Sequence, residues 1–168
     1  VLVETHTAEA LSPGAAVLPH PPRPGEVQRT TREIAERGRR HDAVAYIRAM
    51  ETIRGIARRL AAVFETLDVL LTPALAQPPV PLGTLDAEDP DLDHFYDMTQ
   101  RFAPFSAMFN MSGQPGASIP LHWTAEGLPV GVQAAARIGD EAALIRLASQ
   151  FETARPWAAR RPPGLERV

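Results

Sequence analysis

The stretch that decides the fold is Phe109–Glu152, which reads FNMSGQPGASIPLHWTAEGLPVGVQAAARIGDEAALIRLASQFE. Gly113 is placed to adopt the left-handed backbone conformation that ends many helices, and Pro115 prevents the helix from continuing. We therefore expect a helix to end at Asn110–Gly113. The apolar segment that leads into this end carries three phenylalanines, Phe102, Phe105 and Phe109.

Two strands and a capped helix are predicted after that turn. Ala117–Trp123 has the apolar content of a strand, and Pro120, which lacks an N–H, indicates a sheet edge or a strand end. Thr124–Gly127 is a hairpin loop signal before a second strand at Pro129–Ala136. Asp140 is the expected N-cap of a helix that Arg155-Pro156 stops. The apolar residues of this helix recur at helical spacing: Ala143, Leu144, Leu147, Ala148 and Phe151.

A third strand and a long helix are predicted upstream, the strand within Glu65–Gly83, ETLDVLLTPALAQPPVPLG. Val69–Leu71 is wholly apolar, which predicts a strand buried on both faces and ended by Thr72-Pro73. Asp42–Leu67 reads as one amphipathic helix. Its apolar stripe comprises Ile47, Met50, Ala57, Leu60, Phe64 and Leu67.

From about Arg32 to Pro163 this pattern resembles the C-terminal end of the amidase signature family, and Asp68–Pro73 and Phe105–Glu141 carry the specific part of the resemblance. The resemblance implies an α/β fold: the C-terminal portion of the amidase signature fold, a mixed sheet flanked by helices, incomplete as a standalone domain. We expect residues 26–163 to form this part. Residues 1–25 are expected to be a flexible or diverged segment, and 164–168 a tail.

The residues of this chain do not include the catalytic groups that the resemblance implies. The resemblance implies a serine nucleophile, a second serine on a cis peptide bond and a lysine base, all lying upstream of this region. The chain contains no lysine, and arginine cannot take a base's role because it does not release its proton. It also has no Gly/Ser-rich stretch. We therefore assign no catalytic residue and predict that the chain by itself is inactive, as the C-terminal fragment of a hydrolase that cleaves amide C–N bonds through a serine acyl-enzyme.

Four residues are candidates for contact with an amide substrate, from their positions at strand ends and at the helix–turn junction: Thr72, Phe105, Asn110 and Trp123. The alternatives are core packing for Phe105 and capping for Asn110. A triad of Ser118, His122 and Asp140 is disfavoured, because residues four apart on a strand cannot hydrogen-bond directly.

Composition is that of an ordinary globular protein, with 168 residues, 45% hydrophobic residues and a net charge of −3. There is no apolar run long enough for a transmembrane helix and no signal-peptide pattern at the valine start, so no membrane association is expected. The absence of cysteine is compatible with the cytoplasm. No cofactor or metal is expected: the histidines are scattered, and the acidic run Asp86–His94 reads as a solvated loop.

Two other function classes stay open. One is a non-catalytic module that pairs with a separate chain through an open sheet edge. The other is an arginine-rich RNA-binding protein. Because the arginines alternate with glutamates three or four residues apart, a solvated helix face is favoured over nucleic-acid binding. The expected partners are thus a small amide substrate and the missing N-terminal part of the amidase domain, and a homodimer is left open.

Overall fold

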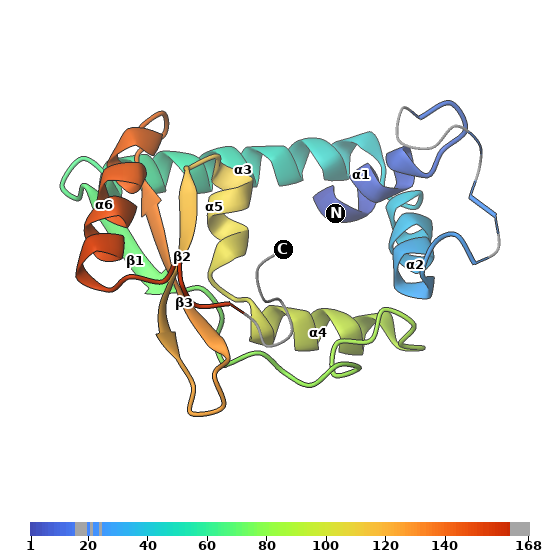
Figure 1. Ribbon diagram of the computed structural model, residues 1–168. Helices are drawn as coiled ribbons and strands as arrows, with labels where there is room; N and C mark the ends of the chain where they lie inside the picture. Colours follow the sequence, from blue (N-terminus) through green and yellow to red (C-terminus); the bar gives the residue numbers. More distant parts are fainter. Residues whose placement is uncertain (16–19, 21, 24, 162–168) are drawn as a thin grey trace. The chain divides into compact units, whose positions relative to one another are not determined.

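The chain folds into two compact units, and the computed structural model describes residues 1–15, 20, 22, 23 and 25–161 (Figure 1). One unit comprises Val1–Ile56 and Pro81–Phe102, and the other comprises Ala57–Val80 and Ala103–Val168. Each unit has its own buried side chains. A chain of this length could form a single hydrophobic core, but here the buried residues are divided between two smaller units.

The first unit is helical: it holds α1 (Leu2–Ala10), α2 (Arg29–Gly38), α4 (Leu92–Phe102) and the beginning of α3 (Ala43–Val63). Small residues let α1 and α2 lie close together: Ala8 and Gly38 are buried, and Gly38 lies against Glu4 and Ala8. A methyl group added at Gly38 would lie 2.0 Å from the backbone oxygen of Glu4. This contact therefore depends on glycine.

The acidic segment before α4 is tied to α2. The N–H of Thr30 donates to the carbonyl of Ala87 at 3.0 Å, and the Thr30 side chain is buried. Farther along α2, Arg37 Nη1 lies 2.5 Å from Asp93 Oδ1. These contacts hold the acidic segment and the first turn of α4 against α2.

The long helix α3 begins where the sequence predicts, since Asp42 Oδ1 accepts the N–H of Ala45 at 2.7 Å and caps it. It ends at Val63 and not at Leu67, so the predicted C-terminal bound was wrong. The reason is that Phe64 turns into the core: its side chain is fully buried and its carbonyl accepts Arg137 Nη2 at 2.8 Å. The predicted apolar stripe is not buried throughout, because Ile47 is 59% exposed.

The second unit contains the three predicted strands, β1 (Val69–Pro73), β2 (Gly116–Trp123) and β3 (Pro129–Ala136). They form an antiparallel sheet in the order β1-β3-β2. The predicted hairpin loop joins β2 to β3, with Gly127 at φ 84°. Pro120 lies on an edge strand, as predicted, and a bulge follows it between Pro120 and His122.

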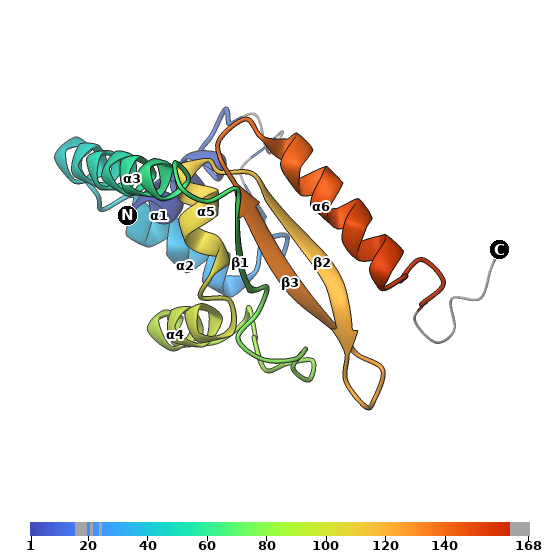
Figure 2. The same cartoon turned by 90° about the vertical axis from the view of Figure 1, so that its left-hand side faces the viewer.

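Helices cover both faces of this sheet (Figure 2). On one face, α6 (Glu141–Ala154) contributes Leu144 to a core with Ile119, Ala134 and Ala136, here called the α6-side core. On the other face, α5 (Ser106–Ser112) contributes Phe109 to a core with Phe64 and Ala135, here called the α5-side core. The predicted caps are confirmed: Asp140 Oδ1 accepts the N–H of Ala143 at 3.2 Å, and Gly113 ends α5 at φ 84°.

Two local predictions in this region were wrong. β1 is not buried on both faces, because it is an edge strand in the described part of the chain and Leu71 is 49% exposed. The phenylalanine-rich segment is not one helix, since α4 ends at Phe102 and α5 begins at Ser106. Pro104 stands in the gap and cannot donate the hydrogen bond that a continuous helix needs.

The ends of the chain are described only in part. Helix α1 occupies Leu2–Ala10, within the segment 1–25 for which flexibility or divergence was expected. Residues 16–19, 21 and 24 of that segment lie outside the described residues, and so does the expected tail 164–168. No helix in the described ranges is both long and apolar enough to cross a membrane.

Candidate functional site

Thr72 belongs to a polar row that crosses the whole sheet. It pairs with Gln133 on β3, and Gln133 pairs with Ser118 on β2. Directly paired residues of antiparallel strands project from the same face, so the three side chains share one face. Gln133 Nε2 donates to Thr72 Oγ1 at 3.2 Å, which orients both groups.

Gly131 lets its neighbours pack closely beside this row. A methyl group at Gly131, two positions before Gln133 on β3, would lie 2.9 Å from Ser118 Oγ and 3.0 Å from Ala74 Cβ. Any larger residue there would push Ser118 or the chain after β1 away. Gly131 thus preserves the close approach of the strands next to the polar row.

Phe105 and Asn110 lie on α5, at its N-cap and in its last turn. Phe105 is half-buried, whereas the exposed Asn110 neighbours the buried Phe109 that packs on Ala135. The left-handed residue that ends the helix is Gly113. Asn110 therefore projects away from the α5-side core.

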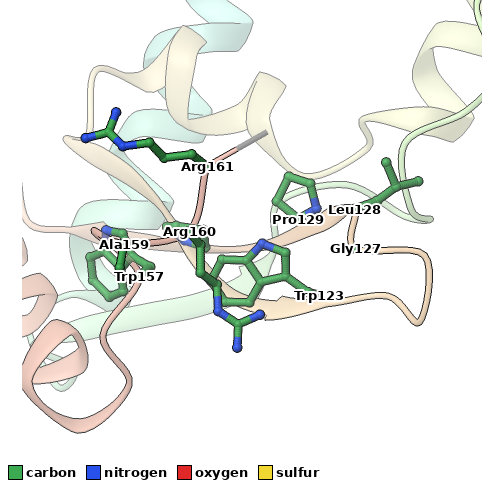
Figure 3. A pocket seen from close by; sticks show the side chains of 9 residues that line it. Trp123, Gly127, Leu128, Pro129, Trp157, Ala159, Arg160 and Arg161 are labelled. Carbon is green, nitrogen blue, oxygen red and sulfur yellow. The ribbon is translucent and has the colours of Figure 1, made fainter. Parts of the chain in front are cut away.

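Trp123 lies at the other end of the sheet, where β2 meets the hairpin loop. It borders a groove of about 600 Å³ whose lining is largely apolar, with Leu128, Pro129 and Trp157 among its residues (Figure 3). The guanidinium carbon of Arg160 lies 4.1 Å from the centre of the Trp123 ring, which is cation–π geometry. Arg161 points away from that ring.

The sheet does not bring Trp123 to Thr72. Trp123 pairs with Pro129, whereas Thr72 pairs with Gln133, four residues farther along β3. At about 3.3 Å per residue, the two positions are roughly 13 Å apart along that strand. The four sequence candidates thus fall into separate places: the polar row, the two parts of α5 and the groove.

Sequence reasoning missed three residues that the structure places beside the candidates: Gln133, Trp157 and Arg160. Gln133 carried a usable signal, because it is the one polar residue in the strand Pro129–Ala136. Trp157 follows the Arg155-Pro156 helix stop and packs against the α6-side core. Arg160 carried no such signal, since its contact with Trp123 arises only from the return of the chain after α6.

The three residues weighed as a triad have other contacts or lie apart. Asp140 caps α6, as described above. Ser118 pairs with Gln133 on β3 and His122 pairs with Val130, and the bulge lies between Ser118 and His122.

In the part of the chain that the structure describes, no group of three or more His, Asp or Glu side chains could hold a metal ion.

The acidic segment is organised by its own backbone. Asp86, Asp89 and Asp91 each accept backbone N–H groups two or three residues ahead, at 2.8–3.1 Å. Asp89 Oδ2 also lies 2.7 Å from His94 Nδ1. The backbone hydrogen bond from Asp91, followed by the one with His94, lowers the pKa of Asp89, and the hydrogen bond with Asp89 raises the pKa of His94.

Two of the predicted charge pairs between arginine and glutamate are present, and a pair of arginine with aspartate lies beside them. Arg39 with Glu36, Arg54 with Glu51, and Arg101 with Asp97 make contacts of 2.5, 2.5 and 2.8 Å at spacings of three or four residues. All of these side chains are substantially exposed, so each pair adds little stability. They give Arg39, Arg54 and Arg101 local partners.

Comparison with known sequences points to one family. A family model described as Amidase matches residues 6–145, beginning earlier than the resemblance recognised from Arg32. The putative amidase AmiB2 of Mycobacterium tuberculosis is 36% identical over 141 residues, covering 83% of this chain and 30% of that protein. The 6-aminohexanoate-cyclic-dimer hydrolase of Paenarthrobacter ureafaciens is 32% identical over 143 residues, covering 82% of this chain and 29% of its own length.

Comparison of structures agrees with this result. A solved structure of 6-aminohexanoate cyclic dimer hydrolase superposes with a TM-score of 0.82 at 28% identity, covering 97% of this chain and 35% of the hydrolase chain. The chain thus spans about 30% of the length of the curated relatives it matches. Its α/β fold is that of the corresponding part of those enzymes, and the chain belongs to the amidase signature family.

Proposed function

We propose that this chain is the C-terminal part of an amidase, a hydrolase that cleaves carboxylic amide C–N bonds through a serine acyl-enzyme. In this proposal the serine nucleophile and its lysine base belong to an N-terminal part of the domain. The 168 residues contribute sheet strands, covering helices and part of the substrate pocket, with the cytoplasm as the expected compartment.

One observation carries the proposal. Nearly the whole chain, 97% of it, superposes on about a third of a cyclic amide hydrolase, yet the chain contains no lysine. A hydroxyl nucleophile needs an adjacent base that can release and regain a proton at neutral pH, and arginine cannot do so. In this proposal the lysine base therefore comes from residues outside these 168.

The polar row is the part of the chain best suited to a role near the substrate. A half-buried hydrogen bond from Gln133 to Thr72 fixes the Thr72 hydroxyl oxygen as an acceptor and leaves its proton free to donate. A hydroxyl held in this way can donate to the carbonyl oxygen of an amide. We include Phe105, Asn110 and Trp123 as further pocket candidates, from their strand-end and helix-end positions.

A graft tests the proposal. In the 6-aminohexanoate-cyclic-dimer hydrolase of Paenarthrobacter ureafaciens, the segment that matches this chain is replaced by residues 6–145, and hydrolysis of the cyclic dimer is measured. We expect the graft to fold and to hydrolyse its substrate, and the 168-residue chain by itself to show no amide hydrolysis.

Two results would refute the proposal. One is amide hydrolysis by the purified 168-residue chain, which would require a catalytic group not recognised here. The other is a soluble, cooperatively folded graft without any activity above that of the hydrolase carrying a mutated nucleophile.

As a matched pair within the graft, Thr72→Ser keeps the hydroxyl and Thr72→Val removes it. If Thr72 contacts the substrate, only the valine variant should lose activity, by about tenfold for one hydrogen bond of about 1.4 kcal/mol.

A further inference from the structure

The two tryptophans of the chain, Trp123 and Trp157, line the same groove of about 600 Å³ (Figure 3). They come from different segments: Trp123 ends β2, whereas Trp157 follows α6 and packs against the α6-side core. Leu128 and Pro129, at the hairpin loop, add to the apolar part of the lining. A groove of this volume with mostly apolar walls suits a small ligand that has a ring or another compact apolar group.

Arg160 supplies a positive charge on the wall of this groove and is held there by two contacts. Its backbone N–H donates to the carbonyl of Trp157 at 2.8 Å, and its guanidinium carbon lies 4.1 Å from the centre of the Trp123 ring. A guanidinium that rests on an aromatic face keeps its N–H donors for a second partner, such as a carboxylate. Within the described ranges, neither Arg160 nor Arg161 has a side-chain hydrogen bond or an ion pair.

The charges around the groove favour an anion. Arg161 also belongs to the lining. Arg160 borders in addition a second hollow of about 370 Å³, where Arg155 Nη1 donates to the carbonyl of Leu121 at 3.1 Å. None of the described residues that line the groove or the hollow is Asp or Glu. A negatively charged ligand would therefore meet positive and neutral groups in this lining.

We propose that the groove between Trp123 and Trp157 binds a small carboxylic acid that has an aromatic ring or a similar apolar group. The carboxylate accepts hydrogen bonds from Arg160, and the ring lies against the apolar lining. A protein segment is a less suitable occupant, because a stable protein interface buries about 1,200–2,000 Å² and the groove is confined to the hairpin and the turn after α6. Binding of such an acid needs no catalytic group, so it does not depend on the proposed amide hydrolysis.

Tryptophan fluorescence of the 168-residue chain tests this assignment directly, because both tryptophans line the groove. The probe is 3-phenylpropionate. Two control ligands separate its parts: 3-phenylpropan-1-ol keeps the ring without the charge, and acetate keeps the charge without the ring. We expect 3-phenylpropionate to change the emission saturably, with a dissociation constant of about 1 mM or tighter. Both controls should bind at least about tenfold more weakly.

A matched pair of variants assigns the carboxylate to one arginine. Arg160→Gln should weaken the binding of 3-phenylpropionate by about tenfold or more and leave that of 3-phenylpropan-1-ol unchanged. Arg146→Gln removes the same charge from an exposed position of α6 that lines neither the groove nor the hollow, and should leave both affinities unchanged. Both arginines are exposed, so the helical circular dichroism of the two variants should match that of the unmodified chain.

Four results would overturn the proposal. The first is the absence of saturable binding of 3-phenylpropionate. The second is equal affinity for 3-phenylpropionate and 3-phenylpropan-1-ol, which would show that the carboxylate is not recognised. An equal loss of affinity in Arg160→Gln and Arg146→Gln would reduce the effect to general charge attraction. Binding that appears only in a chain shortened after Arg161 would assign the groove to residues 162–168 in place of a separate acid.

Discussion

Gly38→Ala should separate α1 from α2 and destabilise the first unit. The new methyl group would lie 2.0 Å from the Glu4 oxygen, 2.4 Å from the Glu4 carbonyl carbon and 2.9 Å from Ala8 Cβ. To reach an ordinary contact of 3.4 Å, the first distance must grow by about 1.4 Å (3.4 minus 2.0), and the nearest atoms are backbone atoms that cannot rotate away. Overpacking of this kind costs about 1–3 kcal/mol, more than the roughly 1 kcal/mol that alanine gains over glycine in a helix.

Gly55→Ala is the matched control for this change. Gly55 lies inside α3 and has no neighbouring atom within 4 Å of an added methyl group. The same substitution there should therefore stabilise the chain by about 0.5–1 kcal/mol, because alanine loses less backbone entropy than glycine. The two variants should thus change the free energy of unfolding in opposite directions: Gly38→Ala should lower it and Gly55→Ala should raise it.

The assay is urea unfolding followed by helical circular dichroism, with residue-level amide exchange in α1 as the local probe, because two compact units need not unfold together. We expect Gly38→Ala to lower the protection of the α1 amides and Gly55→Ala to leave it unchanged. If Gly38→Ala is as stable as the unmodified chain and α1 stays protected, the close packing of α1 on Gly38 is refuted.

Three further predictions concern separate parts of the chain. Phe64→Ala should lower the free energy of unfolding by about 3–5 kcal/mol, since Phe64 is fully buried in the α5-side core, and Phe64→Leu should cost much less; urea unfolding of both variants checks this. Arg160→Ala should change the fluorescence of Trp123 in emission spectra, and no change would contradict the cation–π contact. The raised pKa of His94 predicts that the stabilisation from its hydrogen bond with Asp89 is fully present below the unfolded-state pKa of histidine and is lost as the pH rises through the folded-state value. An NMR titration should show the His94 pKa above its ordinary value of 6.5, and Asp89→Asn should bring it back towards that value.

Local chemistry made the strand, turn and cap positions of the second unit predictable. Gly113, Gly127 and Asp140 each satisfy a backbone requirement that does not depend on distant residues, and all three occupy the predicted positions. The same holds for Pro120 on its edge strand, because a missing N–H is tolerated only where no neighbour needs it. These features depend on neighbours within a few residues along the chain.

Predictions that depended on burial were less accurate. The apolar run Val69–Leu71 indicates a strand with cover on both faces, but whether that cover exists depends on strands from elsewhere, and in this chain Leu71 is half exposed. The end of α3 was missed for a related reason. Helical periodicity continues to Leu67, yet Phe64 is drawn into the α5-side core and the chain turns after Val63.

In the candidate site, too, features set by nearby residues were predictable and contacts between distant residues were not. Sequence position alone selected Thr72 and Trp123, as residues at strand ends, and the turn chemistry around them was predictable. Only the antiparallel register placed Gln133 between Thr72 and Ser118, and only the return of the chain after α6 placed Arg160 over Trp123. The sequence by itself determined the family, the order of the elements from β2 to α6 and the absence of lysine, because these follow from residue identities and short-range geometry. The tertiary structure decided which side chains meet and which sheet edge is left unpaired, because both depend on pairing between residues far apart in the chain.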